Sequence, residues 1–170
     1  MSGVRRPVRV AVLTISDSRT VETDTSGAYL VEAIESSGHL LAGRALVPDD
    51  PTEIRERLRG WVEETGVEVV ISTGGTGITG RDGTPEVVSE LVTKEIPGFG
   101  ELFRWLSFED IGASTIQSRA IAGLSHTTLI FALPGSTNAC RLAWERILKP
   151  QLDIDTRPCN FVDLLPRLEE

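Results

Sequence analysis

The sequence predicts an α/β fold of three layers, in which helices cover both faces of a mostly parallel central sheet. Short apolar runs rich in β-branched residues alternate along the chain with longer segments of helical periodicity. Such alternation is typical of parallel strands that are joined by crossover helices. A chain of 170 residues with 40% hydrophobic and 25% charged side chains fits one globular domain. We therefore expect a single domain over residues 1–170, with a core over about 8–150 and a C-terminal tail over 151–170.

Each element is marked by its apolar spacing and by the glycine or proline near its end. In chain order, the expected elements are a strand at 8–15, a helix at 26–37 ended by Gly38, a strand at 40–47, a helix from Asp50 to about Gly66 and a strand at 67–71. They continue with a helix from Thr84, a helix at 99–107 after Pro97, a helix at 114–124, a strand at 127–133 and a helix at 137–148 before Pro150. Residues 157–168 are expected to form an irregular tail packed on the body.

The second helix begins with a strong start signal. Asp50 is the expected N-cap, Pro51 takes the first helical position and Glu53 completes an acidic form of the capping box. Capping therefore explains Asp50 without any chemistry. It does not explain Asp49, which lies one residue earlier at the carboxyl end of a strand. For Asp49 two interpretations stay open, a solvated loop carboxylate and a functional acid.

A glycine-rich loop over residues 72–86 links the strand at 67–71 to the next helix. Thr84 is the expected N-cap of that helix, and Pro85 fits its first position. A buried strand, a flexible loop and a helix start together offer backbone N–H groups and a positive helix end to an anion, most often a phosphate. The loop is therefore a candidate phosphate site.

Part of this loop matches a dinucleotide-binding fingerprint, because Gly75, Gly77 and Gly80 have the spacing G-x-G-x-x-G. A lone match is weak, and the fingerprint needs a helix that opens at the glycines, whereas residues 81–83 intervene here. No Gly-Lys-Ser or Gly-Lys-Thr follows, so the loop is not a Walker loop either. Two roles stay open for the glycines, a tight turn and the close approach of a ligand, and their number favours the ligand.

Composition and reactive side chains exclude several classes of function. The net charge of −8 argues against a nucleic-acid-binding face, which requires basic residues. No apolar run reaches the roughly 18 residues of a membrane span, and residues 1–9 lack the core of a signal peptide, so we expect a cytoplasmic protein. Cys140 and Cys159 lack zinc-site spacing and are expected as buried free thiols. His39 and His126 are expected on the surface, and no Ser-His-Asp or Cys-His set is apparent.

The loops that follow the parallel strands should meet at one edge of the sheet, where ligands bind in such folds. These loops are residues 16–23, 48–50, 72–85 and 134–136, and they carry Ser16, Asp17, Arg19, Asp24, Asp49, Asp82 and Ser136. A carboxylate 4 Å from a phosphate charge costs ~4 kcal/mol at an effective dielectric constant of 20, so acids and phosphates share a cleft only with a bridging cation. Mg²⁺ suits this role. The sequence therefore predicts Mg²⁺-assisted nucleotidyl or phosphoryl transfer.

Several motifs occur together over nearly the whole chain. They are Thr14-Ile15-Ser16-Asp17, Asp24-Thr25-Ser26-Gly27, Val47-Pro48-Asp49-Asp50, Thr73-Gly74-Gly75-Thr76-Gly77, Arg81-Asp82-Gly83-Thr84-Pro85-Glu86, Pro97-Gly98-Phe99-Gly100-Glu101, Ser118-Arg119, Leu133-Pro134-Gly135-Ser136 and Arg157-Pro158-Cys159-Asn160-Phe161. In combination they resemble the MoaB/Mog family of molybdenum cofactor biosynthesis, which includes the gephyrin G domain and its plant counterpart. The last motif, in the tail, is most similar to MoaB proteins.

The resemblance implies a molybdopterin-binding fold that assembles as trimers or hexamers and works with other proteins of the molybdenum cofactor pathway. It implies that the chain binds ATP and molybdopterin, transfers AMP from Mg-ATP to the molybdopterin phosphate and releases pyrophosphate. The aspartates that active members require fall here on Asp49 and Asp82, which we expect to act in catalysis and to hold Mg²⁺. The expected binding residues are Ser16, Asp17, Gly74, Gly75, Thr76, Gly77, Thr84, Ser107, Pro134, Gly135 and Ser136.

Two other functions stay open at this point. The chain could be a non-catalytic oligomer that binds molybdopterin or a nucleotide in the same pathway, or an oxidoreductase that binds a nicotinamide cofactor at the glycines. Arg119 likewise has two interpretations, a group that faces an anion and a surface ion pair.

Overall fold

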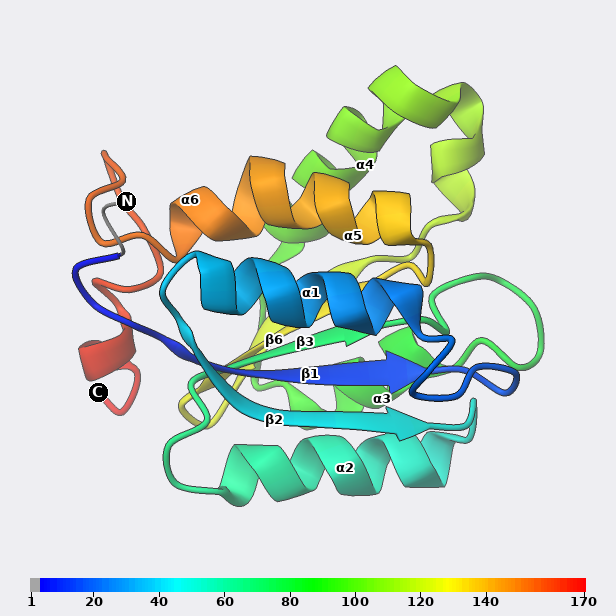
Figure 1. Cartoon of the computed structure of the whole chain (residues 1–170), viewed down its shortest axis with the longest axis horizontal. Helices are drawn as coiled ribbons and strands as arrows, with labels where there is room; N and C mark the ends of the chain where they lie inside the picture. The colour runs from blue at the N-terminus through cyan, green and yellow to red at the C-terminus, as the bar shows by residue number, and fades with distance from the viewer. Residues whose placement is uncertain (1–3) are drawn as a thin grey trace.

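A computed structural model describes residues 4–170 and contains one sheet of six strands in the order β2-β1-β3-β6-β5-β4 (Figure 1). The strands are β1 (Arg9–Ile15), β2 (Leu40–Val47), β3 (Val69–Thr73), β4 (Lys94–Glu95), β5 (Ile121–Ser125) and β6 (Thr128–Leu133). The helices are α1 (Thr25–Ser36), α2 (Pro51–Glu63), α3 (Thr84–Leu91), α4 (Pro97–Ile111), α5 (Thr137–Ala143) and α6 (Lys149–Gln151), with short turns η1 (Gly112–Gln117), η2 (Trp144–Leu148) and η3 (Leu165–Arg167). The predicted three-layer α/β fold with a mostly parallel sheet is confirmed.

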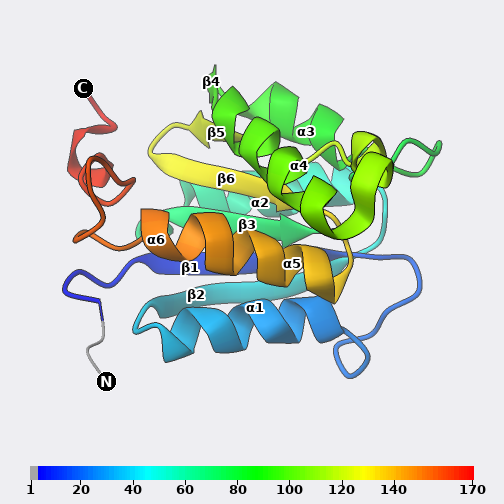
Figure 2. The ribbon, with the colours of Figure 1, turned by 90° about the horizontal axis from the view of Figure 1, so that it is seen from above.

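Four neighbouring strands, β2, β1, β3 and β6, run parallel, and β5 runs antiparallel to both of its neighbours. The carboxyl ends of the parallel strands therefore lie at one end of the sheet, opposite the C-terminus of the chain (Figures 1 and 2). The order reverses beside β1, because β2 pairs with one edge of β1 and β3 with the other. Ligands of open α/β sheets bind at such a reversal.

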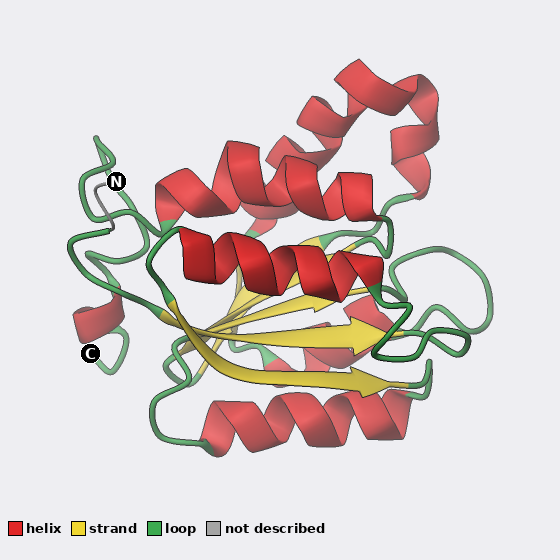
Figure 3. Ribbon diagram, viewed as in Figure 1, coloured by secondary structure: helices red, strands yellow, loops and turns green. Residues whose placement is uncertain are grey.

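Helices cover both faces of the sheet (Figure 3), and successive strand residues point alternately to these two layers. In β1, Val10 and Val12 pack with α1, α4 and α5, whereas Ala11 and Leu13 pack with α2 and α3. Each of these four side chains is fully buried, as expected for parallel strands covered on both faces. The sheet is therefore held between two separate apolar clusters.

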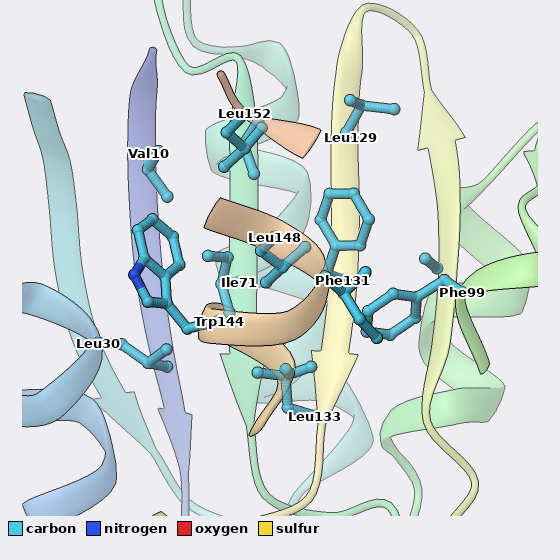
Figure 4. Close-up of a cluster of buried hydrophobic side chains, with 14 of the residues drawn as sticks. Val10, Leu30, Ile71, Phe99, Leu129, Phe131, Leu133, Trp144, Leu148 and Leu152 are labelled. Atoms are coloured by element: carbon cyan, nitrogen blue, oxygen red, sulfur yellow. The ribbon is translucent and has the colours of Figure 1, made fainter. Parts of the chain in front are cut away.

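The larger cluster lies under α1, α4 and α5 (Figure 4). Trp144 is its largest fully buried side chain, and truncation of a buried tryptophan to alanine typically costs about 3–5 kcal/mol. The tail joins the same cluster through Val162 and Leu165, and the Phe161 ring lies 5.5 Å from that of Phe131. The prediction of a tail packed on the body is thus confirmed. None of the helices within residues 4–170 has the length and apolar character that crossing a membrane requires.

The helix predicted at 114–124 is wrong. The chain there forms the short turn η1 and then β5, which pairs with β4 and β6. A Cβ at Gly123 would lie 2.6 Å from Val92, so this glycine permits the close approach of the neighbouring segment. Backbone pairing with β6 has outweighed the local helical pattern, because strand formation depends on neighbours more than on local preference.

Three smaller predictions are wrong in part. His39 is buried rather than on the surface, since its Nδ1 accepts the Val8 N–H at 3.1 Å and its ring meets Trp144 edge-on, and burial lowers its pKa. His126 is exposed as expected. Of the two cysteines, Cys140 is buried and Cys159 is exposed, and both are free. The helix predicted at 137–148 has a π-helical turn at 144–148 and continues to residue 151.

Candidate functional site

A cavity of about 580 Å³ lies at the carboxyl ends of β1, β3 and β6. All four loops predicted to meet at this edge contribute to its wall. The expected site residues on the wall are Ser16, Asp17, Asp49, Gly74, Gly75, Thr76, Gly77, Asp82, Ser107, Pro134, Gly135 and Ser136. The residues of the wall that the sequence did not single out are Ser18, Phe103, Ile111, Gln117 and Ala139. They come mainly from the helical layer, where an apolar residue of a site cannot be told from a core residue by spacing.

The glycine loop is shaped by its own packing. Gly74 has a φ of 112°, and a Cβ there would lie 2.1 Å from the Ile15 carbonyl oxygen. Gly75 has a φ of 70°, and its Cβ would lie 2.3 Å from the Thr84 hydroxyl. These two glycines are therefore required by the turn and by close backbone packing, whatever ligand binds.

Thr84 is not the helix N-cap that the sequence predicted. Gly83 is the N-cap of α3, and Thr84 is the first helical residue. The Thr84 side chain is fully buried and donates its hydroxyl hydrogen to the Gly74 carbonyl at 3.0 Å. It is absent from the cavity wall because it lies behind the loop, which it ties to α3.

The amides of the loop are not equivalent. The Gly74 N–H donates to the last carbonyl of β6 at 2.9 Å, so it is not available to the phosphate that we expected it to hold. Within residues 4–170, the amides of Gly75 and Thr76 have no hydrogen-bond partner. Both residues lie on the cavity wall. The loop therefore offers the cavity two adjacent free donors.

Asp49 carries an unpaired oxygen. Within residues 4–170, its buried Oδ1 has no hydrogen-bond partner. A Cβ at Gly75 would lie 2.8 Å from that oxygen, so the carboxylate rests against bare loop backbone. Desolvation raises the pKa of Asp49, and the negative charges of Asp17 and Asp82 raise it further, against a smaller lowering by Arg81. An enclosed anionic oxygen without a donor is the environment that a cation would complete.

Asp82 faces the same cavity in a different environment. Its Oδ2 accepts the Thr79 hydroxyl hydrogen at 2.7 Å and the Thr79 N–H at 2.9 Å. Hydrogen bonds from Thr79, chiefly from its hydroxyl, lower the pKa of Asp82 despite some desolvation. Among the described residues there is no group of three or more His, Cys, Asp or Glu side chains arranged to hold a metal. A divalent cation between Asp49 and Asp82 would therefore need phosphate or water oxygens as well, which is the usual coordination of Mg²⁺.

Arg119 binds the loop from behind. Its Nε donates to the Gly77 carbonyl at 2.7 Å, its Nη2 to the Asp82 carbonyl at 3.0 Å, and its backbone N–H to the Thr76 carbonyl at 3.0 Å. The same guanidinium pairs with Glu86 on α3. Of its two predicted interpretations, the ion pair is present, but the main role of the side chain is to fix the loop that carries Asp82.

Several polar residues of the edge are used by the fold itself. The Ser16 hydroxyl accepts the backbone N–H of Arg19 at 3.1 Å, and Ser136 caps α5. Asp17 accepts a hydrogen bond from the guanidinium of Arg81 at 3.0 Å, and its pKa is lowered chiefly by a backbone hydrogen bond from Asp49 and further by Arg81. Asp24, which we expected at the edge, caps α1 below the cavity and is 2% exposed. Ser107 lies on the cavity wall as a nearly buried residue of α4.

Comparisons with known proteins identify the family of this chain. A family model described as a probable molybdopterin binding domain matches residues 11–154. The chain is 52% identical to molybdenum cofactor biosynthesis protein B of Escherichia coli K12 over 155 residues, which cover 91% of each chain. It is 45% identical to the protein of that name from a Staphylococcus aureus strain, over 88% of this chain and 90% of the relative.

Solved structures give the same result. A crystal structure of a molybdenum cofactor biosynthesis protein B superimposes with a TM-score of 0.87 at 42% identity and covers 96% of each chain. A tungsten cofactor synthesizing protein MoaB from Pyrococcus furiosus gives 0.81 at 32% identity, over 97% of this chain and 99% of that one. The chain therefore belongs to the MoaB/Mog family of molybdenum cofactor biosynthesis proteins.

Proposed function

We propose that this protein transfers AMP from Mg-ATP to the terminal phosphate of molybdopterin and releases pyrophosphate. In this reaction a phosphate oxygen of molybdopterin attacks the α-phosphorus of ATP, and the bond from that phosphorus to the pyrophosphate oxygen breaks. The observation that carries the proposal is the unpaired Oδ1 of Asp49, a residue that lies on one cavity wall with Asp82 and with the free amides of Gly75 and Thr76. Such a cavity suits a ligand that brings both phosphates and a cation.

The residues of the chain act by alignment and by charge. The two free amides donate to phosphate oxygens, as the backbone does in other phosphate loops. Asp49 and Asp82 hold Mg²⁺, which neutralises charge between the carboxylates and the phosphates when it is bound. The attacking phosphate is already an anion, so the site needs no strong general base. Arg119 keeps Asp82 in place through the loop carbonyls.

Release of pyrophosphate from Mg-ATP in the presence of molybdopterin tests the proposal. Asp82→Asn should lower the rate by about 100-fold or more, the usual scale for losing one electrostatic contact of a transition state. Asp50→Asn is the control, because asparagine also caps helices well and Asp50 lies outside the cavity wall. Equal rates for Asp82→Asn and the wild type would contradict the assigned role of Asp82. Ligand binding by the wild type without turnover would favour the non-catalytic binding protein instead.

We also propose that the protein assembles as a homo-oligomer, a trimer or hexamer, as the family resemblance implies. The support is a run of exposed apolar side chains on α4 and η1, where a monomer would leave them in water. They are Leu102, Trp105, Phe108, Ile111 and Ile116, and Trp105 and Ile116 are the most exposed at 68% and 79%. A second copy of the chain is the occupant that we expect on this face.

A further inference from the structure

The cavity wall has an imbalance of charge. Asp17, Asp49 and Asp82 all lie on it, and among the described residues Arg19 is the one basic side chain on the wall. Arg81 pairs with Asp17, and a single divalent cation would balance the charges of Asp49 and Asp82, so the phosphates of a ligand would keep most of their own negative charge. Any further direct attraction to a phosphate has to come from Arg19 or from the backbone amides.

Arg19 is held in place from below the cavity. It lies in the loop after β1, and its Nη1 donates to the Ser26 hydroxyl at 2.6 Å. The same nitrogen lies 3.8 Å from Oδ1 of Asp24, whose side chain is 2% exposed. Within residues 4–170, the Nε and Nη2 groups of Arg19 have no hydrogen-bond partner. One side of the guanidinium is thus anchored while its other donors remain available, which suits it to bind a planar or tetrahedral oxyanion.

We propose that Arg19 binds a phosphate group of the ligand, in the same cavity as the amides of Gly75 and Thr76. The proposal rests on the proposed function only in that the ligand is phosphorylated, and it does not require turnover. Because Ser26 and Asp24 hold the side chain before the ligand arrives, little side-chain freedom is lost on binding. Ser26 and Asp24 are then positioning residues, and neither lines the cavity.

The presence of an arginine at position 19 is not explained by a need to neutralise the charge of Asp24. Asp24 also accepts the Thr14 hydroxyl hydrogen at 2.6 Å and the guanidinium of Arg44 at 3.2 Å. Arg44 is therefore the nearer cation to the buried carboxylate, and it lies on β2 outside the cavity wall. This makes Arg44 a matched control, because each arginine pairs with Asp24 but only Arg19 faces the cavity.

Titration of the full-length protein with Mg-ATP, and separately with inorganic pyrophosphate and Mg²⁺, tests the proposal. Arg19→Gln should weaken both ligands by about 10- to 100-fold, the scale of losing hydrogen bonds to a charged group. Arg44→Gln should change both affinities by less than about 3-fold, and Arg19→Lys should restore part of the loss because a lysine keeps the charge without the fork. Adenosine, which has no phosphate, should bind equally to all variants.

The proposal is overturned if Arg19→Gln binds pyrophosphate as the wild type does, or if Arg19→Gln and Arg44→Gln lose affinity equally. Circular dichroism and thermal unfolding of both variants show whether either has lost its fold. A failure of the proposed function has a different signature. Suppose that the wild type releases no pyrophosphate, while Arg19→Gln binds Mg-ATP more weakly than both the wild type and Arg44→Gln do. Adenylyl transfer is then wrong, and the phosphate site stands. If the wild type turns over and Arg19→Gln matches its kcat and KM, the phosphate site is wrong and adenylyl transfer stands.

Discussion

Asp49→Asn should make the free protein more stable while it removes activity. The substitution keeps the shape of the side chain and deletes the charge of a carboxylate whose buried Oδ1 has no donor among residues 4–170. It also ends the repulsion that Asp17 and Asp82 exert on this carboxylate. A buried unpaired polar group costs about 1–3 kcal/mol, and the amide retains one unpaired oxygen, so we expect a gain near the lower limit, about 1 kcal/mol. For a chain of this size that is a rise in Tm of roughly 2–4 °C.

The gain should depend on pH in a defined direction. Folding raises the pKa of Asp49 above its ordinary value of 3.8, so the folded protein binds this proton more tightly than the unfolded chain does. The contribution of Asp49 to stability is therefore lost as the pH rises from 3.8 through the raised pKa, and ionised Asp49 destabilises the fold at pH 7. The advantage of Asp49→Asn should be full at pH 7 and should shrink as the pH falls toward 3.8.

Thermal unfolding with and without Mg-ATP, at pH 7, checks both halves of this prediction. At 100 times its Kd the ligand should stabilise the wild type by about 2.7 kcal/mol, and it should stabilise Asp49→Asn much less, so the order of the two Tm values inverts. Asp50→Ala serves as the control, because it deletes the cap that accepts two N–H groups of α2 and should cost about 1 kcal/mol with turnover retained. A free Asp49→Asn protein less stable than the wild type at pH 7 would refute the reasoning from the unpaired oxygen.

Three further predictions concern the loop and the surface. Gly74→Ala places a Cβ 2.1 Å from a β1 carbonyl and should lower the free energy of unfolding, measured by urea titration, by at least about 3 kcal/mol. Gly80→Ala is the control, because its Cβ would have nothing within 4 Å, and it should change this free energy by no more than about 0.5 kcal/mol. Similar losses for the two variants would contradict the account of the loop. Arg119→Ala should lower kcat by more than about 10-fold, because the contacts that fix the loop are lost. Glu86→Gln removes only the ion pair with Arg119 and should lower kcat by less than about 3-fold. Equal losses would assign the effect to the ion pair. Trp105→Glu should lower the molar mass measured by light scattering, and a monomeric wild type would disprove the oligomer.

Features set by a few neighbouring residues could be predicted from the sequence. The cap of α2 is an example, because Asp50 accepts the N–H groups of Thr52 and Glu53, only two and three residues away. The convergence of Asp49 and Asp82 was also predictable in outline. Both follow parallel strands, and parallel strands bring their carboxyl ends to one edge.

Features set by distant parts of the chain were missed. β5 exists because Ile121–Ser125 pairs with β6, while its own spacing favours a helix. The Gly74 amide was expected to be free, but it pairs with Leu133, which lies far along the chain. His39 is enclosed by Trp144 for the same reason. In each case the partner residue, and not the local pattern, decides the outcome, and a pattern within one segment contains no information about that partner.

The construction of the loop explains how acids and phosphate donors can share one small cavity. Gly74 and Gly75 have conformations that other residues adopt with strain, and Thr84 and Arg119 bind the loop carbonyls from behind. These contacts use loop carbonyls, and within residues 4–170 the amides of Gly75 and Thr76 have no hydrogen-bond acceptor. The loop can therefore hold Asp49 beside free donors without collapsing onto it. The repulsion among the carboxylates therefore remains in the free protein. A ligand that contains both a cation and a phosphate satisfies the carboxylates with the cation and the free amides with the phosphate.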